Sequence, residues 1–205
     1  MSAEITELRQ MKNDCFELSL SSGEKFRVTL NDVADFSLYT GRELTDDALA
    51  SVKEAAALSR CKERAMRIIS ARAMSERELY DRLVEKGETE QNAAAAVAWL
   101  VDLHFLNDAD YAAMLVRHYA ARGYGPRRVR DELYRRKVPK ELWDDALSEM
   151  PEQDDTIDRL LRSRLRGADV EDRAALKKAT DALLRRGFGW DEIKEAVERY
   201  QSEFT

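Results

Sequence analysis

Three stretches of twelve residues decide the fold of this chain: ERELYDRLVEKG (76–87), PRRVRDELYRRK (126–137) and LKKATDALLRRG (176–187). They recur every 50 residues, so that Leu83, Leu133 and Leu183 stand in one register. The same register holds for three further sets: Lys86, Arg136 and Arg186; Ala96, Ala146 and Ala196; Val97, Leu147 and Val197. A fixed period of this length indicates an array, in which one small helical unit recurs and each copy covers its neighbour's apolar face. Arrays offer long surfaces rather than deep catalytic pockets.

Each copy of the array is expected to contain three helices. The expected ranges are 60–72, 75–86 and 89–103 in copy one, 108–122, 126–137 and 139–150 in copy two, and 154–166, 171–186 and 190–203 in copy three. Ser75 and Glu78 have the spacing of a capping box, and Gly87 can end a helix with a positive φ. Pro126 and Pro139 suit first helical positions. The first helix of copy three does not align, so the register is predicted only for the second and third helices.

The first 30 residues alternate apolar and polar side chains, which predicts a hairpin or a three-stranded meander. Asn31 or Asp32 is expected to cap a short helix that runs to about Tyr39. A second helix is expected from Thr45 to about Leu58. The predicted fold class is therefore mainly α: three tandem three-helix repeats forming an elongated curved array, preceded by a small strand-rich N-terminal segment. The expected domains are residues 1–58, 59–106, 107–150 and 151–205.

Composition indicates a globular protein without a membrane span. Apolar residues make up 44% of the 205 residues, and no run approaches the roughly 18 to 20 apolar residues that cross a bilayer. The N-terminus, Met1-Ser2-Ala3-Glu4, lacks the basic flank and apolar core of a signal peptide. We therefore expect a cytoplasmic protein.

Cys15 and Cys61 are expected to be free, buried, small apolar residues rather than a disulfide.

The charge of the chain is unevenly distributed. The total is −6, and residues 1–55 carry six basic and eleven acidic groups, a net of −5. Residues 115–140 carry nine basic groups against Asp131 and Glu132, a net of +7. A local field governs binding, so this stripe can hold a polyanion on an acidic protein. The candidate binding residues are Arg117, Arg122, Tyr124, Arg127, Arg128, Arg130, Arg135, Arg136 and Lys137.

Two interpretations of this stripe stay open. Arginine forks suit phosphate or carboxylate, which favours a binding surface. The alternative is a solvated helix face that Asp131 and Glu132 balance. A second basic cluster ranks lower because more acidic residues surround it: Arg162, Arg164, Arg166, Arg185 and Arg186.

Aromatic residues and one acid receive mainly structural roles. Tyr111 is expected in the core, whereas Tyr124 is equally compatible with base stacking and with turn packing. Core positions are expected for Trp99, Trp143 and Trp190. Asp108 is expected to cap a helix or to pair with an arginine.

The sequence predicts no enzyme, cofactor or metal site. His104 and His118 are the only histidines, and no zinc-ligand spacing joins them to the cysteines. We find no nucleophile with a base and an orienting group, and no phosphate-binding glycine loop.

Three segments, taken in order and spacing, carry a family resemblance. They are SEREL (75–79) continuing to Lys86-Gly87, FLNDADYA (105–112), and RGYGPRRV (122–129) continuing to Glu132-Leu133. Over about residues 58–205 the chain resembles the RecX family of bacterial regulatory proteins. The second and third segments are the specific ones. Residues 1–55 match less distinctly.

The resemblance implies a non-catalytic modulator made of three tandem three-helix repeats. Such proteins bind the filament that RecA recombinase forms on single-stranded DNA and lie in its groove. They inhibit its ATPase, strand-exchange and coprotease activities, in homologous recombination, DNA repair and the SOS response. The implied partners are the RecA filament and the single-stranded DNA within it, with duplex DNA bound at most weakly; we expect a monomer and no membrane partner. Where the family usually has glycine, this chain has Lys137, which predicts a different joint there.

An independent DNA-binding regulator is the alternative function, because three-helix units resemble helix-turn-helix modules. It would bind duplex DNA tightly and sequence-selectively without a partner. Against it, the arginines follow one stretch of chain, which favours contact with a backbone over the reading of bases.

Overall fold

The structure, a computed structural model, describes residues 2–11, 15–166 and 172–203. It divides into two compact units, Met1–Ala73 with Leu79–Leu106 and Met74–Glu78 with Asn107–Thr205. Each unit is described by itself below. No helix in the described ranges has the length and apolar character needed to cross a bilayer.

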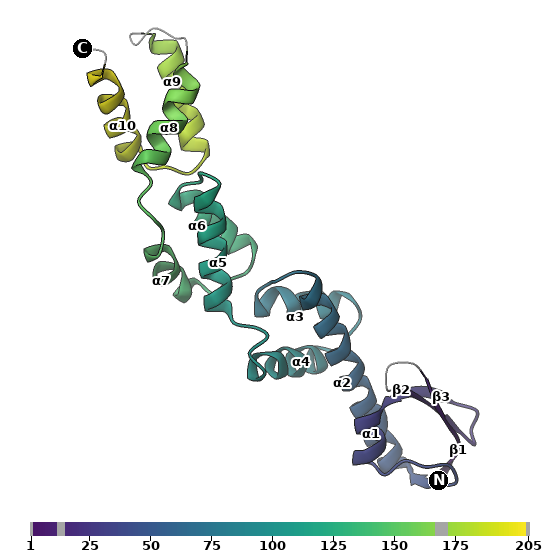
Figure 1. The fold of residues 1–205 in the computed structure, drawn as a ribbon. Helices are drawn as coiled ribbons and strands as arrows, with labels where there is room; N and C mark the ends of the chain where they lie inside the picture. The colour runs from purple at the N-terminus through teal and green to yellow at the C-terminus, as the bar shows by residue number, and fades with distance from the viewer. Residues whose placement is uncertain (1, 12–14, 167–171, 204–205) are drawn as a thin grey trace. The chain divides into compact units, whose positions relative to one another are not determined.

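An antiparallel sheet opens the first unit (Figure 1). Its strands, in the order β3-β2-β1-β4, are β1 (Ser2–Gln10), β2 (Cys15–Leu20), β3 (Lys25–Thr29) and β4 (Glu43–Thr45). The predicted meander is confirmed as β1, β2 and β3. Strand β4 was not predicted; it pairs with the start of β1, Ser2 opposite Thr45.

The short helix α1 (Leu30–Asp35) begins earlier than expected. The Thr29 hydroxyl accepts the backbone N–H of Asp32 at 3.2 Å, and the Asp32 carboxylate accepts the N–H of Thr29 at 2.7 Å. This capping box fixes Thr29 as the cap. The predicted cap at Asn31 or Asp32 and the predicted end near Tyr39 are therefore wrong.

Helix α2 (Asp46–Ala71) is one continuous helix where two were expected. No glycine or proline occurs within it, so nothing in the backbone ends the helix near Leu58. Val52 and Ala56 belong to the apolar core of the sheet. Further along, Cys61 is fully buried, with its thiol 3.5 Å from the backbone oxygen of Asn92. The helix thereby connects the strand-rich segment to the first repeat.

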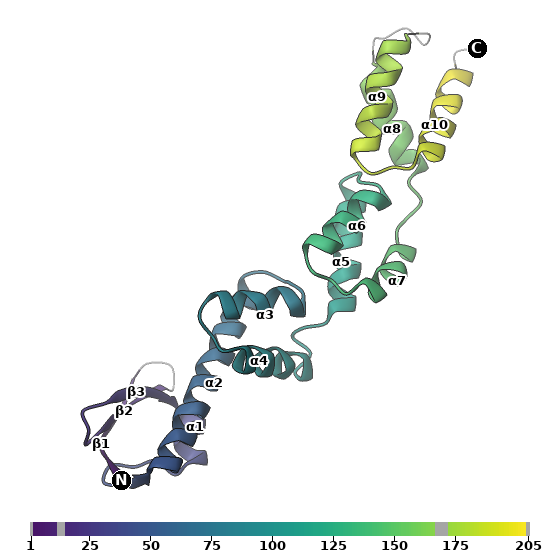
Figure 2. The same cartoon turned by 180° about the vertical axis from the view of Figure 1, so that it is seen from behind.

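The remaining helices follow the predicted order of three per copy, with the second half of α2 as the first helix of copy one (Figures 1 and 2). They are α3 (Glu76–Glu85) and α4 (Glu90–Asp102); α5 (Asp108–Ala121), α6 (Pro126–Arg135), the 3-10 turn η1 (Lys140–Leu142) and α7 (Trp143–Ser148); then α8 (Asp154–Leu165), α9 (Arg173–Arg185) and α10 (Trp190–Ser202). Pro126 is at a first helical position as predicted. Pro139 instead precedes η1 as its cap residue. The expected start of α9 at residue 171 lies outside the described residues.

The 50-residue register is a packing register. Leu83 and Leu133 are 0% exposed and Leu183 is 1% exposed. The alanines of the register, Ala96, Ala146 and Ala196, are buried as well. The expected three-helix repeats are therefore confirmed, with each copy burying the same positions of its second and third helices.

Candidate functional site

The basic stripe lies on α5 and α6 in the second unit. Val129 and Leu133 on α6 are fully buried, which turns the opposite face of the helix outward. Arg127, Arg130 and Tyr134 recur on that outer face at spacings of three and four residues, so they form one exposed ridge. Tyr134 is 68% exposed. Tyr134 was not among the predicted binding residues, although its spacing from Arg127 and Arg130 is the signal that places it there.

Glu132 neutralises part of the stripe from within. Its carboxylate is buried and accepts from Arg136 Nε at 2.9 Å and lies 3.4 Å from Arg135 Nη1. Burial raises the pKa of the Tyr119 hydroxyl, and its hydrogen bond to Glu132 raises it further. Two of the candidate arginines are thus held by one acid that also lies against Tyr119. Of the two acids expected to balance the stripe, Asp131 is exposed.

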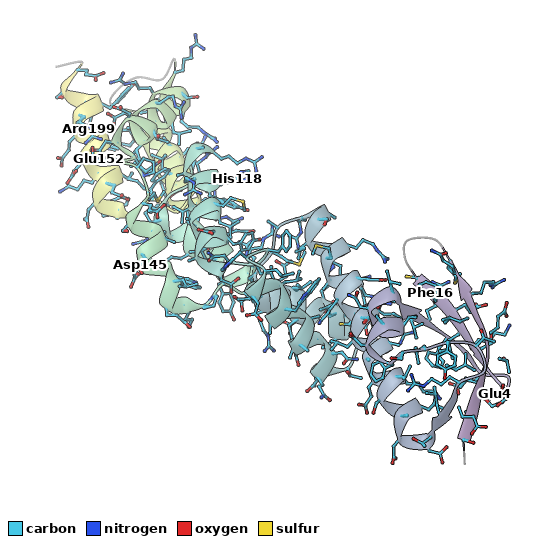
Figure 3. The ribbon with its side chains drawn as sticks, turned by 60° about the horizontal axis from the view of Figure 1, so that its bottom comes forward. Glu4, Phe16, His118, Asp145, Glu152 and Arg199 are labelled. Atoms are coloured by element: carbon cyan, nitrogen blue, oxygen red, sulfur yellow. The ribbon has the colours of Figure 1, made fainter. Side chains whose placement is uncertain are left out.

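Two arginines of the exposed ridge stay without an acidic partner. Arg127 and Arg130 form no ion pair with any residue in the described part of the chain. On α5, by contrast, Arg117 Nη1 lies 3.3 Å from Glu149 Oε2. Arg122 Nη1 lies 3.2 Å from Nε2 of His118, which is labelled in Figure 3. The ridge of α6 therefore carries two exposed guanidinium groups that no described acid balances.

Tyr124 packs into the joint between copies two and three. The guanidinium carbon of Arg186 lies 5.3 Å from the centre of its ring, and the ring of Tyr119 lies 5.6 Å away. Arg186 Nη1 also donates to the backbone oxygens of Arg122 and Gly123, each at 3.0 Å. Arg186, one of the second basic cluster, is thus a structural residue here, and it covers one face of Tyr124.

Backbone contacts close the same joint. Gly125 donates its N–H to the carbonyl of Arg186 at 2.9 Å, and Arg127 donates to the carbonyl of Gly187 at 3.1 Å. A Cβ on Gly125 would lie 2.5 Å from the Gly187 oxygen, and one on Gly187 would lie 2.3 Å from the nitrogen of Arg128. Only glycine permits this approach. Arg128, half-buried, has its backbone against the joint.

The joint between copies one and two repeats this pattern 50 residues earlier. Ser75 donates its hydroxyl to the carbonyl of Arg136 at 2.5 Å and accepts the N–H of Glu78 at 3.1 Å. Asp108 Oδ1 accepts the N–H of Glu76 at 2.9 Å, so it caps α3 although it begins α5. Both contacts belong to the second unit.

Family models match most of the helical part of the chain. The first, second and third three-helix domains of RecX match residues 61–100, 107–147 and 152–197. The chain belongs to the RecX family. A curated relative from Vibrio campbellii, named regulatory protein RecX, is 31% identical over 137 residues, which is 66% of this chain and 88% of the relative. One of the same name from Stenotrophomonas maltophilia is 36% identical over 143 residues, 69% of this chain and 86% of the relative.

Solved structures of RecX proteins share the fold. A crystal structure of a regulatory protein RecX gives a TM-score of 0.76 at 22% identity, and the match covers 94% of this chain and 99% of that one. The crystal structure of RecX from Lactobacillus salivarius gives a TM-score of 0.65 at 22% identity, covering 70% and 96%.

Lys137, the departure from the usual RecX glycine, keeps the glycine conformation. Its φ is 57°, beside 86° for Gly87 and 90° for Gly187 at the equivalent positions. The backbone bond that follows is also the same, from Val138 to Leu133 at 3.0 Å. The expectation of a different joint is wrong for the backbone, because the surrounding contacts hold the lysine in the left-handed region at a strain cost. Its side chain is exposed beside the ridge.

Other predicted residues of this RecX-family chain have structural positions. Tyr111 is buried in the core of copy two, as predicted. Asp108 is buried, and burial raises the pKa of its carboxyl, although the hydrogen bond from Glu76 lowers it. Burial, followed by the charge of Asp108, also raises the pKa of Glu76. The two acids lie together at the start of α3.

The tryptophans divide between core and surface. Trp143 packs on the core of copy two and donates its Nε1–H to the Val138 carbonyl at 3.0 Å. Trp99 is half-buried. Trp190 is 54% exposed, so its predicted core position is wrong. It begins α10, where Ile193 rather than the tryptophan faces the core.

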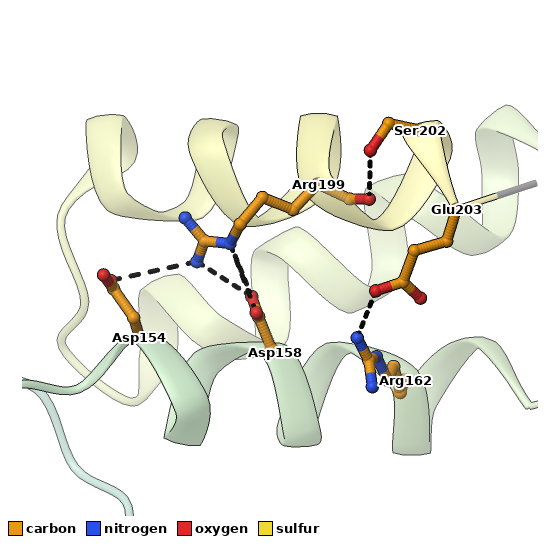
Figure 4. A network of polar contacts seen from close by, with 6 residues as sticks. All are labelled: Asp154, Asp158, Arg162, Arg199, Ser202 and Glu203. Carbon is orange, nitrogen blue, oxygen red and sulfur yellow. Dashed lines mark hydrogen bonds and ion pairs between the residues drawn. The ribbon is translucent and has the colours of Figure 1, made fainter. Parts of the chain in front are cut away.

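Ion pairs occupy part of the second basic cluster in copy three (Figure 4). Arg162 pairs with Glu203, and Arg199 on α10 donates to Asp158 on α8 at 2.9 Å. Arg199 Nη2 also lies 3.8 Å from Asp154. Arg164, Arg166 and Arg185 are exposed. Among the described residues of this cluster, Arg162 therefore joins α8 to the end of α10, and Arg199, outside the cluster, adds a second link between the same helices.

The described residues contain no group of three or more histidine, cysteine, aspartate or glutamate side chains placed to hold a metal ion. Both cysteines are free, Cys61 buried and Cys15 only half-buried, against the expectation that both are buried. What the second unit offers is a charged, partly aromatic surface suited to contact with a large partner.

Proposed function

We propose that this chain is a non-catalytic regulator that binds the RecA–single-stranded DNA filament and inhibits its ATPase, strand-exchange and coprotease activities. Membership of the RecX family supplies the partner. The observation that supports the contact is the ridge of α6, where Arg127 and Arg130 stand exposed beside Tyr134 without an acidic partner among the described residues. The cellular setting of this proposal is the bacterial cytoplasm, in DNA repair, homologous recombination and the SOS response.

The charge distribution favours an assembled filament over free DNA. The chain as a whole carries −6, so a free polyanion is repelled by most of its surface. A filament that presents phosphate or carboxylate at the ridge can use the guanidinium forks, and its other surfaces can contribute contacts that free DNA lacks. We therefore expect weaker binding to single-stranded DNA alone than to the filament.

The remaining candidate residues contribute less under this proposal. Arg135 and Arg136 share Glu132, and Arg117 lies beside Glu149, so each has part of its charge balanced within the chain. Tyr124 and Arg128 support the joint that holds α6 in place. Lys137 and Arg122 extend the positive field at the two ends of the stripe.

The test titrates the DNA-dependent ATPase of RecA with the wild-type chain and with R127A/R130A at fixed salt. Loss of two phosphate or carboxylate contacts is expected to raise the half-inhibiting concentration about tenfold and to flatten its salt dependence. The matched control is R164A/R185A, which removes two exposed arginines from copy three and is expected to inhibit like the wild type. Helical circular dichroism should be the same for all three proteins.

Two results would contradict the proposal. Equal inhibition by R127A/R130A and by the control would move the contact away from the ridge. No inhibition by the wild type at equimolar protein, together with tight and sequence-selective duplex binding, would favour the independent helix-turn-helix-like regulator.

A further inference from the structure

An open groove of about 1210 Å³ lies in the first unit, and no residue of the α6 ridge belongs to its lining. It is formed where the ends of the strands meet the middle of α2, which Figure 1 shows beside the sheet. Its lining residues include four basic side chains: Arg9, Arg27, Lys62 and Arg67. Among the described lining residues, Glu63 is the single acid.

The sheet wall of the groove carries a row of charges across three strands. Arg9 of β1 is opposite Glu17 of β2, which is opposite Arg27 of β3. Phe16 and Leu18, the neighbours of Glu17, pack in the core of the sheet, so the row lies on the other face. Arg9 pairs with Glu17 at 2.6 Å. Arg27 is exposed and forms no ion pair with a described residue.

The helix wall is one face of α2. Its lining residues, spaced by three and four positions, are Ser59, Lys62, Glu63, Met66 and Arg67. Trp99 from α4 completes this wall, and Lys62 Nζ lies 5.3 Å from the centre of its ring. Arg67 is exposed and, within the described residues, has no ion-pair partner. Basic side chains from the strands and from α2 thus line the same groove.

This concentration of charge contrasts with its surroundings. Residues 1–55 carry a net −5, yet the described lining residues comprise four basic groups, of which Arg9 is paired with Glu17, and one acid. A local excess of this kind attracts a polyanion even when the rest of the surface repels it. The groove is open rather than enclosed, which suits a chain that runs through it better than a small anion.

The groove also contains apolar surface that a simple anion would not use. Met11, Met66 and Trp99 line it together with Leu30, which is 51% exposed. Bases of a single strand bind such surfaces by stacking and apolar contact, while their phosphates meet the basic groups. Duplex DNA hides its base faces, and an acidic peptide has none.

We propose that this groove is a second binding site, for single-stranded nucleic acid. Arg27 from β3 and Arg67 from α2 contact phosphates, and Trp99 with Leu30 contacts bases. The site stands apart from the proposed regulation of RecA, because it needs no recombinase and uses no residue of the ridge.

The test measures fluorescence anisotropy of a labelled thymidine oligonucleotide of about 20 nucleotides with the full chain and no recombinase. The variant R27A/R67A removes the two unpaired arginines. K25A/R60A is the matched control, because it removes two exposed positive charges from β3 and α2 in the same unit but outside the lining. R27A/R67A is expected to bind about tenfold more weakly, with the log–log salt slope reduced by about 1.4, since each single-strand phosphate contact contributes about 0.7. K25A/R60A and R127A/R130A are expected to stay within about twofold of the wild type.

A second measurement uses Cys15, which lines the groove and is half-buried. The oligonucleotide is expected to slow alkylation of Cys15, followed by mass spectrometry, in the wild type but not in R27A/R67A. Equal binding by R27A/R67A and K25A/R60A would overturn the proposal. Competition for the labelled oligonucleotide by oligoglutamate or by duplex DNA of equal charge, as strong as competition by unlabelled single strand, would also overturn it.

Discussion

Replacing Gly187 with alanine tests the joint between copies two and three. The residue has a φ of 90°, and its added Cβ would lie 2.3 Å from the nitrogen of Arg128. The left-handed conformation alone costs an alanine about 1 to 2 kcal/mol. The clash must also separate the two backbone bonds at the joint, from Gly125 and Arg127, each worth about 0.5 to 1.5 kcal/mol. We expect the free energy of unfolding to fall by roughly 2 to 5 kcal/mol.

Two matched variants separate these contributions. Gly87 has nearly the same φ, 86°, but no atom lies within 4 Å of the place that an alanine methyl would take there, so Gly87→Ala carries the backbone strain alone. Gly125 has an ordinary φ of −81°, yet its Cβ would lie 2.5 Å from the Gly187 oxygen, so Gly125→Ala carries the clash alone. Urea unfolding followed by circular dichroism measures all three. If Gly187→Ala costs no more than Gly87→Ala, the close approach described for this joint is refuted.

Three further predictions follow from single residues. Lys137→Gly is expected to raise the free energy of unfolding by about 1 kcal/mol in the same assay, because glycine adopts the positive φ without strain. A lower free energy of unfolding would mean that the lysine is not strained. Burial raises the pKa of the Asp108 carboxyl, so the folded state binds this proton more tightly than the unfolded state does, and the free energy of unfolding falls as the pH rises above about 4. Asp108→Asn is expected to make the urea midpoint depend less on pH across that range. An unchanged dependence would contradict this prediction. Burial raises the pKa of Cys61 to about 11, so alkylation of the native chain near neutral pH is expected at Cys15 first. Mass spectrometry identifies the modified cysteine, and modification of Cys61 first would contradict its burial.

The repeat architecture was predictable because its signals are local and periodic. Leu83, Leu133 and Leu183 mark buried positions at one spacing, and Pro126 and Gly87 mark helix boundaries by their own backbone preferences. The single helix α2 was missed because the expected repeat boundary suggested a break where the backbone has none.

Non-local contacts explain most of the other differences. Strand β4 has three residues and exists only because it pairs with the start of β1. The basic stripe was visible in the sequence, but which of its arginines have partners within the chain was not. Glu132 turns inward between two arginines, and Arg186 reaches Tyr124 from another copy. The exposure of Trp190 likewise depends on which neighbour, here Ile193, fills the core.

The two joints have a direction, and the groups that would continue it at either end bond within the chain. At each joint the start of one helix donates to a carbonyl in the turn of the next copy, as Ser75 does to Arg136. In copy one the equivalent carbonyl, that of Lys86, already accepts from Arg64 at 2.9 Å. In copy three the first N–H groups of α9 already bond to Asp172. A head-to-tail contact left open at its ends can add further copies of a molecule. Arg64 and Asp172 bond to the groups that correspond to the joint at the two ends, so these groups are satisfied within the chain rather than left for a second molecule.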